Sequence, residues 1–205
     1  MLAVVDYDAG NLRSVARAVE HAGGVPRVTC NPRDVLRATA VILPGVGSAQ
    51  QAMDRLAHLG MDEALKTIAE RGVPLLGVCL GLQVLLSHSD EGGQAGTDCL
   101  NVVPGTVRHI STSFKVPHMG WNTVDYCRPL GLFDGIPDHS YFYFVHSYFA
   151  VPPTDLVSGV TEYGGPFCSV LSHENVLGTQ FHPEKSGRDG LRIYANFLRS
   201  AGLCS

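Results

Sequence analysis

The chain contains one short segment with the residue types of a cysteine nucleophile, Gly77-Val78-Cys79-Leu80-Gly81. Apolar residues lead into it from Val73, and a second apolar run, Leu82 to Leu86, follows it. This spacing predicts a strand, a sharp turn and a helix, with glycines at the two places where a Cβ would obstruct the turn. A helix N-terminus also favours the thiolate of Cys79, which is the nucleophilic form. The alternative is a structural cysteine buried in a glycine-bearing strand.

A cysteine nucleophile needs a general base, and the chain has nine histidines. His182 is the best candidate because His182-Pro183-Glu184 follows an apolar strand and the proline restrains His182 to extended backbone. On extended backbone, positions 182 and 184 project to one side, so the Glu184 carboxylate can fix the tautomer of the imidazole. This pattern predicts a triad of Cys79, His182 and Glu184. The alternative is a histidine that satisfies hydrogen bonds at a strand end, beside a solvated Glu184.

A second glycine-bearing segment, Pro44-Gly45-Val46-Gly47, follows another apolar strand. Gln50 breaks the G-x-G-x-x-G spacing and no G-x-x-x-x-G-K-[ST] occurs, which excludes a nucleotide loop. Its glycines instead allow the N–H groups of Val46 and Gly47 to face an oxyanion, beside the N–H of Leu80. An ordinary strand-to-helix turn is the alternative. Because H-E-x-x-H and EF-hand patterns are absent from the sequence, we expect neither a metal nor another cofactor.

The composition is typical of a soluble globular protein. The 205 residues are 45% hydrophobic and 17% charged, with a formal net charge of −4 and no Lys or Arg cluster, which argues against a nucleic-acid partner. The first residues, Met1–Asp6, lack the basic segment and the apolar length of a signal peptide, and residues 73–86 are too short to span a bilayer. We therefore expect a single domain over residues 1–205, in the cytoplasm and away from membranes.

Six cysteines lie far apart in the sequence without a C-x-x-C pair, which indicates neither a disulfide framework nor a zinc site. Apart from Cys79, we expect them to be reduced and either buried or incidental. They are Cys30, Cys99, Cys127, Cys168 and Cys204.

The first half of the chain alternates short apolar runs with amphipathic stretches, which predicts a parallel sheet covered by helices on both faces. The second half is rich in β-branched and aromatic residues and predicts antiparallel meanders before a closing helix. We therefore expect an α/β fold in three layers, with a mostly parallel central sheet and an antiparallel β extension. The expected strands are 2–5, 25–30, 41–43, 75–78, 107–110, 120–126, 141–151 and 156–162, with a hairpin of 170–171 and 176–181. The expected helices are 12–22, 49–59, 61–71, the residues after Cys79, and 191–198, and residues 91–96 are an expected flexible loop.

Together these motifs resemble the class I (triad) glutamine amidotransferases, whose fold is flavodoxin-like, and more narrowly the glutaminase subunits of imidazole glycerol phosphate synthase. The resemblance covers essentially the whole chain. The Cys79 segment and His182-Pro183-Glu184 are typical of the superfamily, whereas His118-Met119-Gly120-Trp121-Asn122 and Lys185-Ser186-Gly187 are typical of this member. Other matching segments are 6–12, 44–47, 144–148 and 180–181. The chain departs from the family pattern at Ala49, where an aromatic residue is common, and at Leu100-Asn101-Val102, which replaces Gly-Leu-Gly.

The resemblance implies a mechanism in which Cys79 attacks the side-chain amide of glutamine, His182 protonates the leaving nitrogen, and water opens the resulting thioester. Glu184 orients His182 in this mechanism. The resemblance also implies that Gln83 recognises the amino-acid end of glutamine, although a half-exposed helix residue is the alternative at that position. The implied backbone contacts to glutamine come from His146, Ser147 and Tyr148.

In the family, ammonia passes into a separate (β/α)8 cyclase subunit, where it meets a phosphoribulosyl formimino nucleotide during histidine biosynthesis. The resemblance therefore implies a heterodimer with such a subunit. Trp121 would otherwise be assigned to the core and Lys185 to the solvated surface, but the resemblance assigns both to the partner interface. Asn11 and Ser14 are further interface candidates. His118 and Tyr143 are left unassigned, because each could be a core residue or a residue near the site.

Two other functions stay open at this stage. The first is a triad amidohydrolase that acts on γ-glutamyl compounds without a synthase partner, which should be active on its own. The second is a catalytically silent regulatory module with the same fold. The presence of Cys79, His182 and Glu184 argues against the second.

Overall fold

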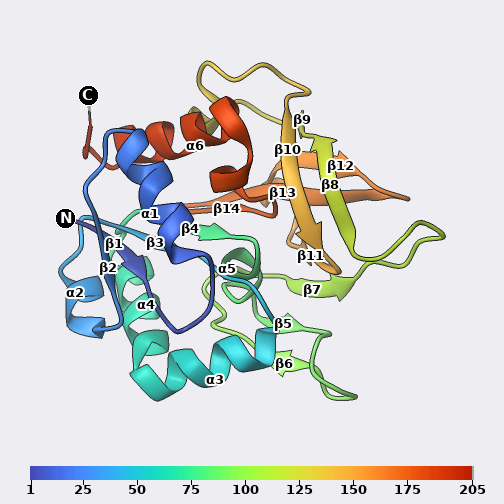
Figure 1. Ribbon diagram of the computed structural model, residues 1–205. Helices are drawn as coiled ribbons and strands as arrows, with labels where there is room; N and C mark the ends of the chain where they lie inside the picture. Colours follow the sequence, from blue (N-terminus) through green and yellow to red (C-terminus); the bar gives the residue numbers. More distant parts are fainter. Residues whose placement is uncertain (205) are drawn as a thin grey trace.

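A computed structural model describes residues 1–204 and has an eight-stranded sheet at its centre (Figure 1). Its parallel part contains, in spatial order, β2 (Pro26–Thr29), β1 (Leu2–Val5), β3 (Ala40–Leu43), β4 (Leu75–Val78) and β14 (Val176–Thr179). The sheet continues antiparallel through β13 (Pro166–His173), β12 (Val157–Glu162) and β9 (Asp125–Tyr126). The expected α/β architecture, a mostly parallel sheet with an antiparallel extension, is confirmed.

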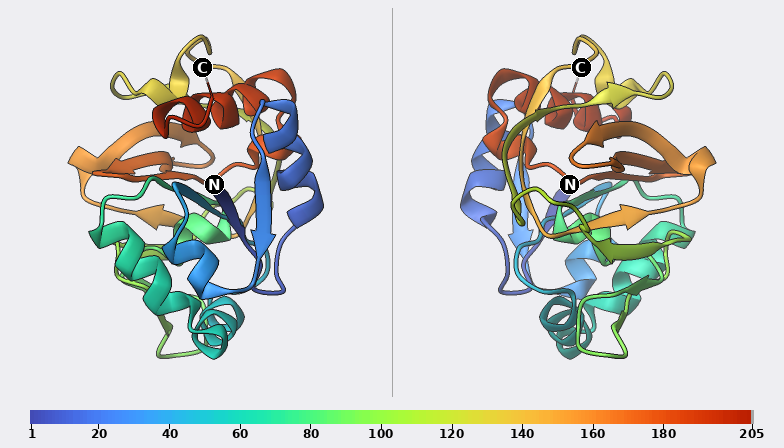
Figure 2. Two further views of the ribbon diagram at one scale, coloured as in Figure 1. Left: turned by 90° about the vertical axis from the view of Figure 1, so that its left-hand side faces the viewer. Right: turned by 90° about the vertical axis from the view of Figure 1, so that its right-hand side faces the viewer.

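Helices cover both faces of this sheet because its central strands are apolar on both sides. Every residue of β1, β3 and β4 is buried, as parallel strands between two helical layers require. One face packs against α1 (Leu12–His21) and α6 (Gly187–Ser200), the other against α2 (Pro32–Leu36), α3 (Ala49–Leu59) and α4 (Met61–Glu70). In Figure 2 the red α6 and the cyan α3 lie on opposite sides of the sheet. None of the helices within residues 1–204 is long and apolar enough to cross a bilayer.

Two smaller sheets stand beside the central one. The first is an antiparallel ribbon of β8 (His118–Thr123) and β10 (Tyr141–His146). The second contains β11 (Tyr148–Val151), β7 (Thr106–His109), β5 (His88–Ser89) and β6 (Thr97–Asp98). Residues at the junction of β10 and β11 contact the segment that follows β4, so these sheets enclose the carboxyl end of β4.

Two of the expected strands are wrong as single elements. The expected strand 120–126 is divided at Val124, where the backbone bonds to the turn before β10, so β8 and β9 belong to different sheets. The expected strand 141–151 is divided at Ser147, whose carbonyl bonds to the residue after β7, so β10 and β11 also separate. Both halves of each segment have the same β-rich composition, which is why composition does not reveal the change of sheet.

The C-terminal hairpin of β13 and β14 is confirmed, with a shorter turn than expected in which Glu174 adopts φ 50°. α6 begins at Gly187 rather than at residue 191. α2 was not expected, although Asn31 caps it and Pro32 occupies its first turn, a pairing typical of helix starts. The remaining short helices are α5 (Leu80–Gln83) and the 3-10 helices η1 (Gly131–Phe133), η2 (Thr154–Leu156) and η3 (Pro183–Lys185).

Candidate active site

Cys79 lies in the sharp turn between β4 and α5 that the glycine spacing predicts. Its backbone has φ 53° and ψ −110°, a conformation that is strained for a residue with a side chain. A Cβ on Gly81 would lie 1.8 Å from the carbonyl oxygen of Leu43, and a Cβ on Gly77 would lie 2.8 Å from the backbone of Leu82. Gly77 therefore allows β4 and α5 to approach each other at this turn, and Gly81 allows α5 to approach the end of β3.

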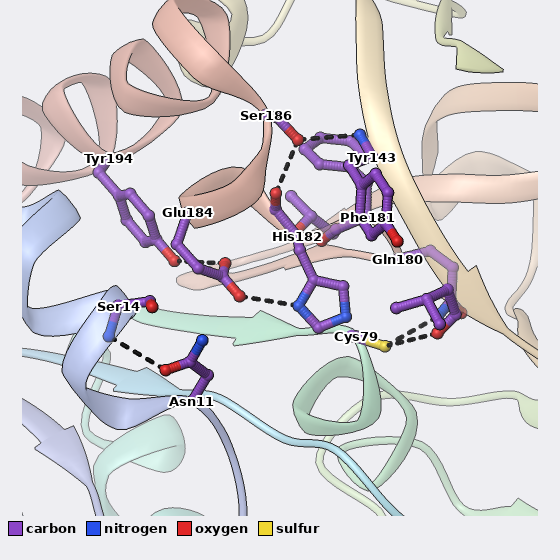
Figure 3. Close-up of polar contacts among 12 residues, drawn as sticks. Asn11, Ser14, Cys79, Tyr143, Gln180, Phe181, His182, Glu184, Ser186 and Tyr194 are labelled. Atoms are coloured by element: carbon purple, nitrogen blue, oxygen red, sulfur yellow. Dashed lines mark hydrogen bonds and ion pairs between the residues drawn. The ribbon is translucent and has the colours of Figure 1, made fainter. Parts of the chain in front are cut away.

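His182 and Glu184 form a buried pair beside Cys79 (Figure 3). Nδ1 of His182 lies 2.8 Å from Oε1 of Glu184, and both side chains are 2% exposed. The hydroxyl of Tyr194, on α6, donates to the second carboxylate oxygen at 3.2 Å. Because Nδ1 is bonded to the carboxylate, Nε2 is the nitrogen that faces the sulfur of Cys79. The structure thus brings together the three side chains that the sequence suggested as a triad.

The backbone of His182 and Glu184 does not form the continuous extended segment that the sequence predicted. β14 ends at Thr179, and His182 has the extended φ −99° and ψ 98° that the following proline requires. Glu184 belongs to η3, so the two side chains meet across a helical turn and not along one side of a strand. Oγ of Ser186 donates to the carbonyl of His182 at 2.6 Å and accepts from the N–H of Tyr143 at 3.0 Å, which ties this turn to β10.

The surroundings of His182 determine its charge. Burial by itself lowers the pKa of the imidazole, but the negative charge of Cys79 and the bonded carboxylate of Glu184 outweigh it and raise the pKa to about 10. Nε2 makes no hydrogen bond within residues 1–204, and its proton is directed at the sulfur. At neutral pH the raised pKa keeps the imidazole of His182 protonated. The site therefore holds an acid directly beside the sulfur of Cys79.

The sulfur has two further polar neighbours that the sequence did not suggest. Nε2 of Gln180 donates to Sγ of Cys79 at 3.7 Å, and the carbonyl oxygen of Val145 lies 4.0 Å from the same atom. Oε1 of Gln180 accepts from Nε2 of Gln83 at 3.1 Å, which fixes the orientation of the Gln180 amide. Gln180 is close to His182 in sequence, but nothing in that spacing shows which way its side chain points.

A cavity of about 460 Å³ opens beside Cys79, a size suited to a small ligand. All the residues expected to form the oxyanion site or to bind glutamine line this one cavity: Val46, Gly47, Leu80, Gln83, His146, Ser147 and Tyr148. Its wall is completed by His182 and Lys185 and by three residues outside the expected set, Glu91, Pro117 and Val145.

Gln83 is buried, so the alternative of a half-exposed helix residue is wrong. Its side chain is held by the carbonyl of Tyr148, which accepts from Nε2 at 2.8 Å, and by Oε1 of Gln180, which accepts the second N–H at 3.1 Å. Both amide protons are therefore in use, and the amide oxygen is the atom of Gln83 left to bind a ligand in the cavity.

Glu91 is a candidate binding residue that sequence reasoning missed. It follows β5 and is the single carboxylate among the described residues that line the cavity. Its Oε2 accepts from the N–H of Ala49, the first residue of α3, at 2.7 Å. The sequence predicted only a flexible loop at 91–96, because an isolated acidic residue in a glycine-rich segment carries no pattern. Its negative charge gives the cavity wall an acceptor for a cationic group.

The segment Pro44–Gly47 lies against the start of α5. A Cβ on Gly45 would lie 2.5 Å from the hydroxyl of Tyr7 and 2.9 Å from Cβ of Leu80, so only glycine fits there. Gly47 has φ 102°, a conformation that favours glycine. The N–H groups of Val46 and Gly47 are thus carried by a segment that glycines leave free to adopt unusual conformations beside the cavity.

Comparison with known proteins identifies the family that shares these features. The family profile described as glutamine amidotransferase class-I matches residues 3–201. The chain belongs to the class-I glutamine amidotransferase family.

Named relatives show which subgroup of the family this amidotransferase belongs to. A protein of Moorella thermoacetica named imidazole glycerol phosphate synthase subunit HisH is 50% identical, covering 98% of this chain and 97% of its own. A protein of Dehalococcoides mccartyi with the same name is 46% identical over 98% of both chains. The resemblance inferred from the motifs is therefore confirmed, and the chain is an amidotransferase subunit of the HisH type.

Solved structures agree on the fold of this amidotransferase. A crystal structure of a glutamine amidotransferase superimposes with a TM-score of 0.77 over 98% of both chains at 19% sequence identity. The crystal structure of a putative GMP synthase component from Thermoplasma acidophilum superimposes with a TM-score of 0.71, covering 98% of this chain and 93% of its own, also at 19% identity. At this identity the likeness concerns the fold alone.

The partner-interface candidates of this amidotransferase lie at or near its surface. Trp121 is 55% exposed, so its default assignment to the core is wrong; its ring meets that of Tyr143 edge-on at 6.1 Å. Nζ of Lys185 lies 5.7 Å from the centre of the same Tyr143 ring. Asn11 is exposed and also caps α1, where its side chain accepts from the N–H of Ser14 at 3.3 Å.

Neither of the two departures from the family pattern is among the residues that line the cavity. Ala49 is fully buried at the start of α3 and supplies the N–H that Glu91 binds. The N–H groups of Leu100, Asn101 and Val102 bond to carbonyls of the segment after α5, and Asn101 takes φ 54° to do so. These bonds hold residues 100–102 against the segment that follows α5.

Proposed function

We propose that this protein hydrolyses glutamine to glutamate and ammonia through a cysteinyl thioester, and that a cyclase subunit uses the ammonia to form imidazole glycerol phosphate in histidine biosynthesis. The main support for this proposal is the arrangement of three side chains beside one cavity: buried Glu184 is bonded to His182, and His182 faces Cys79. The names of the HisH relatives support the synthase assignment.

In the first step, the thiolate of Cys79 attacks the side-chain amide carbon of glutamine. The imidazolium of His182 stands beside the sulfur and stabilises the thiolate that makes this attack. The amide oxygen becomes negative as the C–S bond forms. The donors proposed for it are the N–H of Leu80 and an N–H of Val46 or Gly47, and one such donor contributes roughly 10² to 10³ in rate.

In the second step, ammonia leaves. The Nε2 proton of His182 passes to the leaving nitrogen as the C–N bond breaks, which leaves a thioester on Cys79 and a neutral imidazole. Water then adds to the thioester carbonyl while His182 takes its proton, and the C–S bond breaks to give glutamate and restore the thiolate. Glu184, which Tyr194 holds in place, keeps the proton on Nδ1 and stabilises the imidazolium.

Recognition of glutamine needs acceptors for its α-ammonium group and donors for its α-carboxylate. The carboxylate of Glu91 and the amide oxygen of Gln83 are the acceptors proposed for the ammonium group, since both residues line the cavity. The backbone of His146, Ser147 and Tyr148 forms the neighbouring wall and is proposed to supply the donors. The side-chain amide then extends toward the sulfur.

Glutamate release tests this function directly. We expect the isolated chain to hydrolyse glutamine slowly, and the cyclase subunit with its nucleotide ligand to raise turnover by orders of magnitude, because the glycine-flanked oxyanion segment can rotate. Cys79→Ala should abolish glutamine turnover, while its complex with the cyclase still uses ammonium salts. Cys168→Ala, which removes a buried thiol that does not line the cavity, is the matched control and should remain active.

Three outcomes would contradict the proposal in different ways. Glutamine turnover by Cys79→Ala would remove Cys79 from the mechanism. Full activity of the isolated chain would favour a free γ-glutamyl amidohydrolase. An unreactive Cys79 in the presence of a glutamine-analogue electrophile would favour a catalytically silent module.

The exposed face of the β8–β10 ribbon is the proposed surface for a (β/α)8 cyclase subunit. Met119, Trp121 and Tyr141 are 62%, 55% and 62% exposed, and the strand register puts them on one face with Tyr143. Lys185 contacts the Tyr143 ring and also lines the cavity, so this face adjoins the place where ammonia forms. Exposed aromatic side chains are enriched among the residues that dominate binding energy at interfaces.

Alanine substitutions at this surface test the partner assignment. Trp121→Ala and Lys185→Ala should each weaken coupling, so that more glutamate is released than imidazole product is formed, while Cys79 still reacts with an electrophile. The effect of Lys185→Ala should fall at high salt, because an exposed ion pair is screened and a ring contact is not. Arg188→Ala, which removes a nearby exposed cation, is the control. A wild-type product ratio and wild-type affinity for the cyclase in both variants would contradict the assignment.

A further inference from the structure

Two buried histidines lie directly behind the surface that carries Trp121. Alternate residues of β8 point to opposite faces, so His118 and Asn122 lie on the hidden face of the ribbon. His118 is paired across the ribbon with His146 of β10, and the two are 3% and 6% exposed. The ring of Phe167 packs against both. The proposed triad chemistry uses neither imidazole.

The two rings form a hydrogen-bond chain with one direction. The carbonyl of Tyr148 can only accept, so Nδ1 of His146, 2.9 Å away, carries a proton. Nε2 of His146 is then an acceptor, and Nδ1 of His118 donates to it at 3.0 Å. Nε2 of His118 is left to accept from Nδ2 of Asn122 at 3.3 Å. A second proton on either ring would leave two donors facing each other within the chain.

The same chain continues into the cavity wall. The carbonyl of Tyr148 accepts from His146 and also from Nε2 of Gln83, at 2.8 Å. Gln83 donates its other amide proton to Gln180, whose own amide donates to the sulfur of Cys79. Hydrogen bonds thus run without a break from the hidden face of β8, past the glutamine-binding candidate Gln83, to the nucleophile.

We propose that His118 and His146 are a neutral pair of positioning residues that hold the Tyr148 carbonyl and the Gln83 amide in place at the wall of the glutamine cavity. This role rests on the proposed glutaminase function, since glutamine is the ligand that the wall receives. Because the pair also joins that wall to the strand that carries Trp121, a shift of β8 changes the position of Gln83.

Burial keeps the pair in the neutral state that the chain requires. It lowers the pKa of His118 to about 4. Burial also lowers the pKa of His146 to about 3; the hydrogen bond to Tyr148 opposes this shift, and the positive charge of His182 adds to it. In this buried setting, loss of one donor leaves its acceptor without a partner, which costs more than the net gain from an ordinary hydrogen bond.

Two substitutions of His118 test the role in the chain assembled with its cyclase subunit. Leucine fills the space without a donor for His146, whereas the amide N–H of asparagine lies near the position of Nδ1. We expect His118→Leu to raise KM for glutamine about ten-fold, with a smaller change in kcat, because an unpaired buried acceptor loosens the wall. His118→Asn should keep KM within about two-fold of wild type. An unchanged KM in His118→Leu would overturn the proposal.

Phe167→Leu is the matched control for packing. The ring of Phe167 lies 5.8 Å from that of His118 and 5.1 Å from that of His146 but makes none of the hydrogen bonds in the chain. We expect this variant to lower the midpoint of thermal unfolding and to leave KM for glutamine near the wild-type value. A rise in KM equal to that of His118→Leu would assign the effect to packing and overturn the positioning role.

The protonation of the two histidines can also be measured in the wild-type protein, without any substitution. Nitrogen-15 NMR of the histidine-labelled chain distinguishes the two neutral tautomers and the charged ring. At pH 7 we expect both His118 and His146 to be neutral with the proton on Nδ1. A proton on Nε2 of either ring would contradict the direction of the chain.

Glutamine binding to the Cys79→Ala chain separates this inference from the proposed function. In that inactive background, calorimetry should show about ten-fold weaker binding when His118→Leu is added. If the wild-type complex hydrolyses glutamine but His118→Leu changes neither KM nor this affinity, the positioning role alone fails. If the wild-type complex does not hydrolyse glutamine at all, the proposed function fails.

Discussion

His182 is subject to two opposite influences, and their balance determines the chemistry of the site. Burial opposes a charge on the imidazole, whereas the sulfur of Cys79 and the carboxylate of Glu184 favour one and prevail. The imidazolium is therefore in place beside the sulfur before substrate arrives. In the proposed mechanism, control of the reaction then depends on the glycine-flanked segment near Gly47, whose positive φ shows an unusual backbone conformation.

Two buried tyrosines show how a hydrogen-bond partner changes the contribution of a hydroxyl group to the stability of the fold. Tyr7 and Tyr194 are both fully buried, but the hydroxyl of Tyr194 donates to Glu184, whereas that of Tyr7 has no partner within residues 1–204. A buried polar group without a partner destabilises the folded state. We therefore predict that Tyr7→Phe raises the free energy of unfolding by about 1 kcal/mol, measured by urea titration.

Tyr194→Phe is the matched control and should have the opposite sign. It removes a hydrogen bond to a buried carboxylate, so the free energy of unfolding should fall by about 1 to 3 kcal/mol. Glutamine turnover should fall as well, because Glu184 orients His182 less well. A loss of stability in Tyr7→Phe as large as that in Tyr194→Phe would show that the Tyr7 hydroxyl has a partner.

Among the elements, the turn from β4 into α5 is the one most sensitive to a single methyl group. A Cβ on Gly81 would lie 1.8 Å from the carbonyl oxygen of Leu43, and backbone cannot move aside as a flexible side chain can. We predict that Gly81→Ala either fails to fold or loses more than about 4 kcal/mol of unfolding free energy. Circular dichroism and urea titration measure both outcomes.

Gly131→Ala is the control for this prediction. Gly131 starts η1, its φ is not positive, and the atom nearest to an added Cβ is 3.9 Å away on Asp134. Its free energy of unfolding should stay within about 0.5 kcal/mol of wild type. If Gly81→Ala were equally neutral, α5 and the end of β3 could approach each other without the glycine, contrary to the observed contact with Leu43.

Sequence patterns predicted the elements whose conformation depends mainly on residues close together in the chain. The elbow at Cys79 could be recognised because its glycines, strand and helix lie within ten or so residues. The clash at Gly77 is with Leu82 inside this segment, whereas the clash at Gly81 is with Leu43 of β3, which the local pattern does not show. The division of 141–151 at Ser147 could not be recognised. There the chain changes partner from β8 to β7, a choice made by distant segments and not by the residues at the junction.

At the scale of the whole molecule, the site is assembled from segments far apart in the chain. Cys79 follows β4, His182 and Glu184 follow β14, and Tyr148 comes from β11 of a separate sheet. β4 and β14 are neighbours in the central sheet, so their carboxyl ends bring Cys79 and His182 to one edge. The ribbon of β8 and β10 covers that edge and exposes Trp121 on its other face.

This assembly explains which site residues the sequence could not reveal. Glu91, Gln180 and Tyr194 each act through a contact with a residue distant in sequence or on another element: the start of α3, the sulfur of Cys79 and the carboxylate of Glu184. None of these three residues is part of a sequence motif whose spacing is fixed by a catalytic or binding function. The triad candidates could be found because a nucleophile elbow and a histidine with a nearby carboxylate are constrained locally.

The buried histidines make the stability of the whole protein depend on pH. The pKa values of His118 and His146 in the folded state, about 4 and about 3, lie below the ordinary value of about 6.5. As pH falls from about 6.5 toward 4, the unfolded chain binds protons at these sites that the folded chain does not bind, so the free energy of unfolding decreases. Each site contributes a slope of up to about 1.4 kcal/mol per pH unit in this window, reached where the unfolded site is protonated and the folded site is not.

We predict that His118→Asn, which removes one of these sites, has a shallower decrease in unfolding free energy between pH 6 and pH 5 by about 1.4 kcal/mol per pH unit. His139→Asn is the control with the opposite sign. The hydrogen bond to Asp125 and the charge of Asp138 raise the pKa of His139, so its protonated form stabilises the folded state and its removal should not flatten the decrease. Urea titrations across this range measure the slopes. Equal slopes in wild type and His118→Asn would mean that His118 is charged in the folded protein, which contradicts the neutral hydrogen-bond chain behind Trp121.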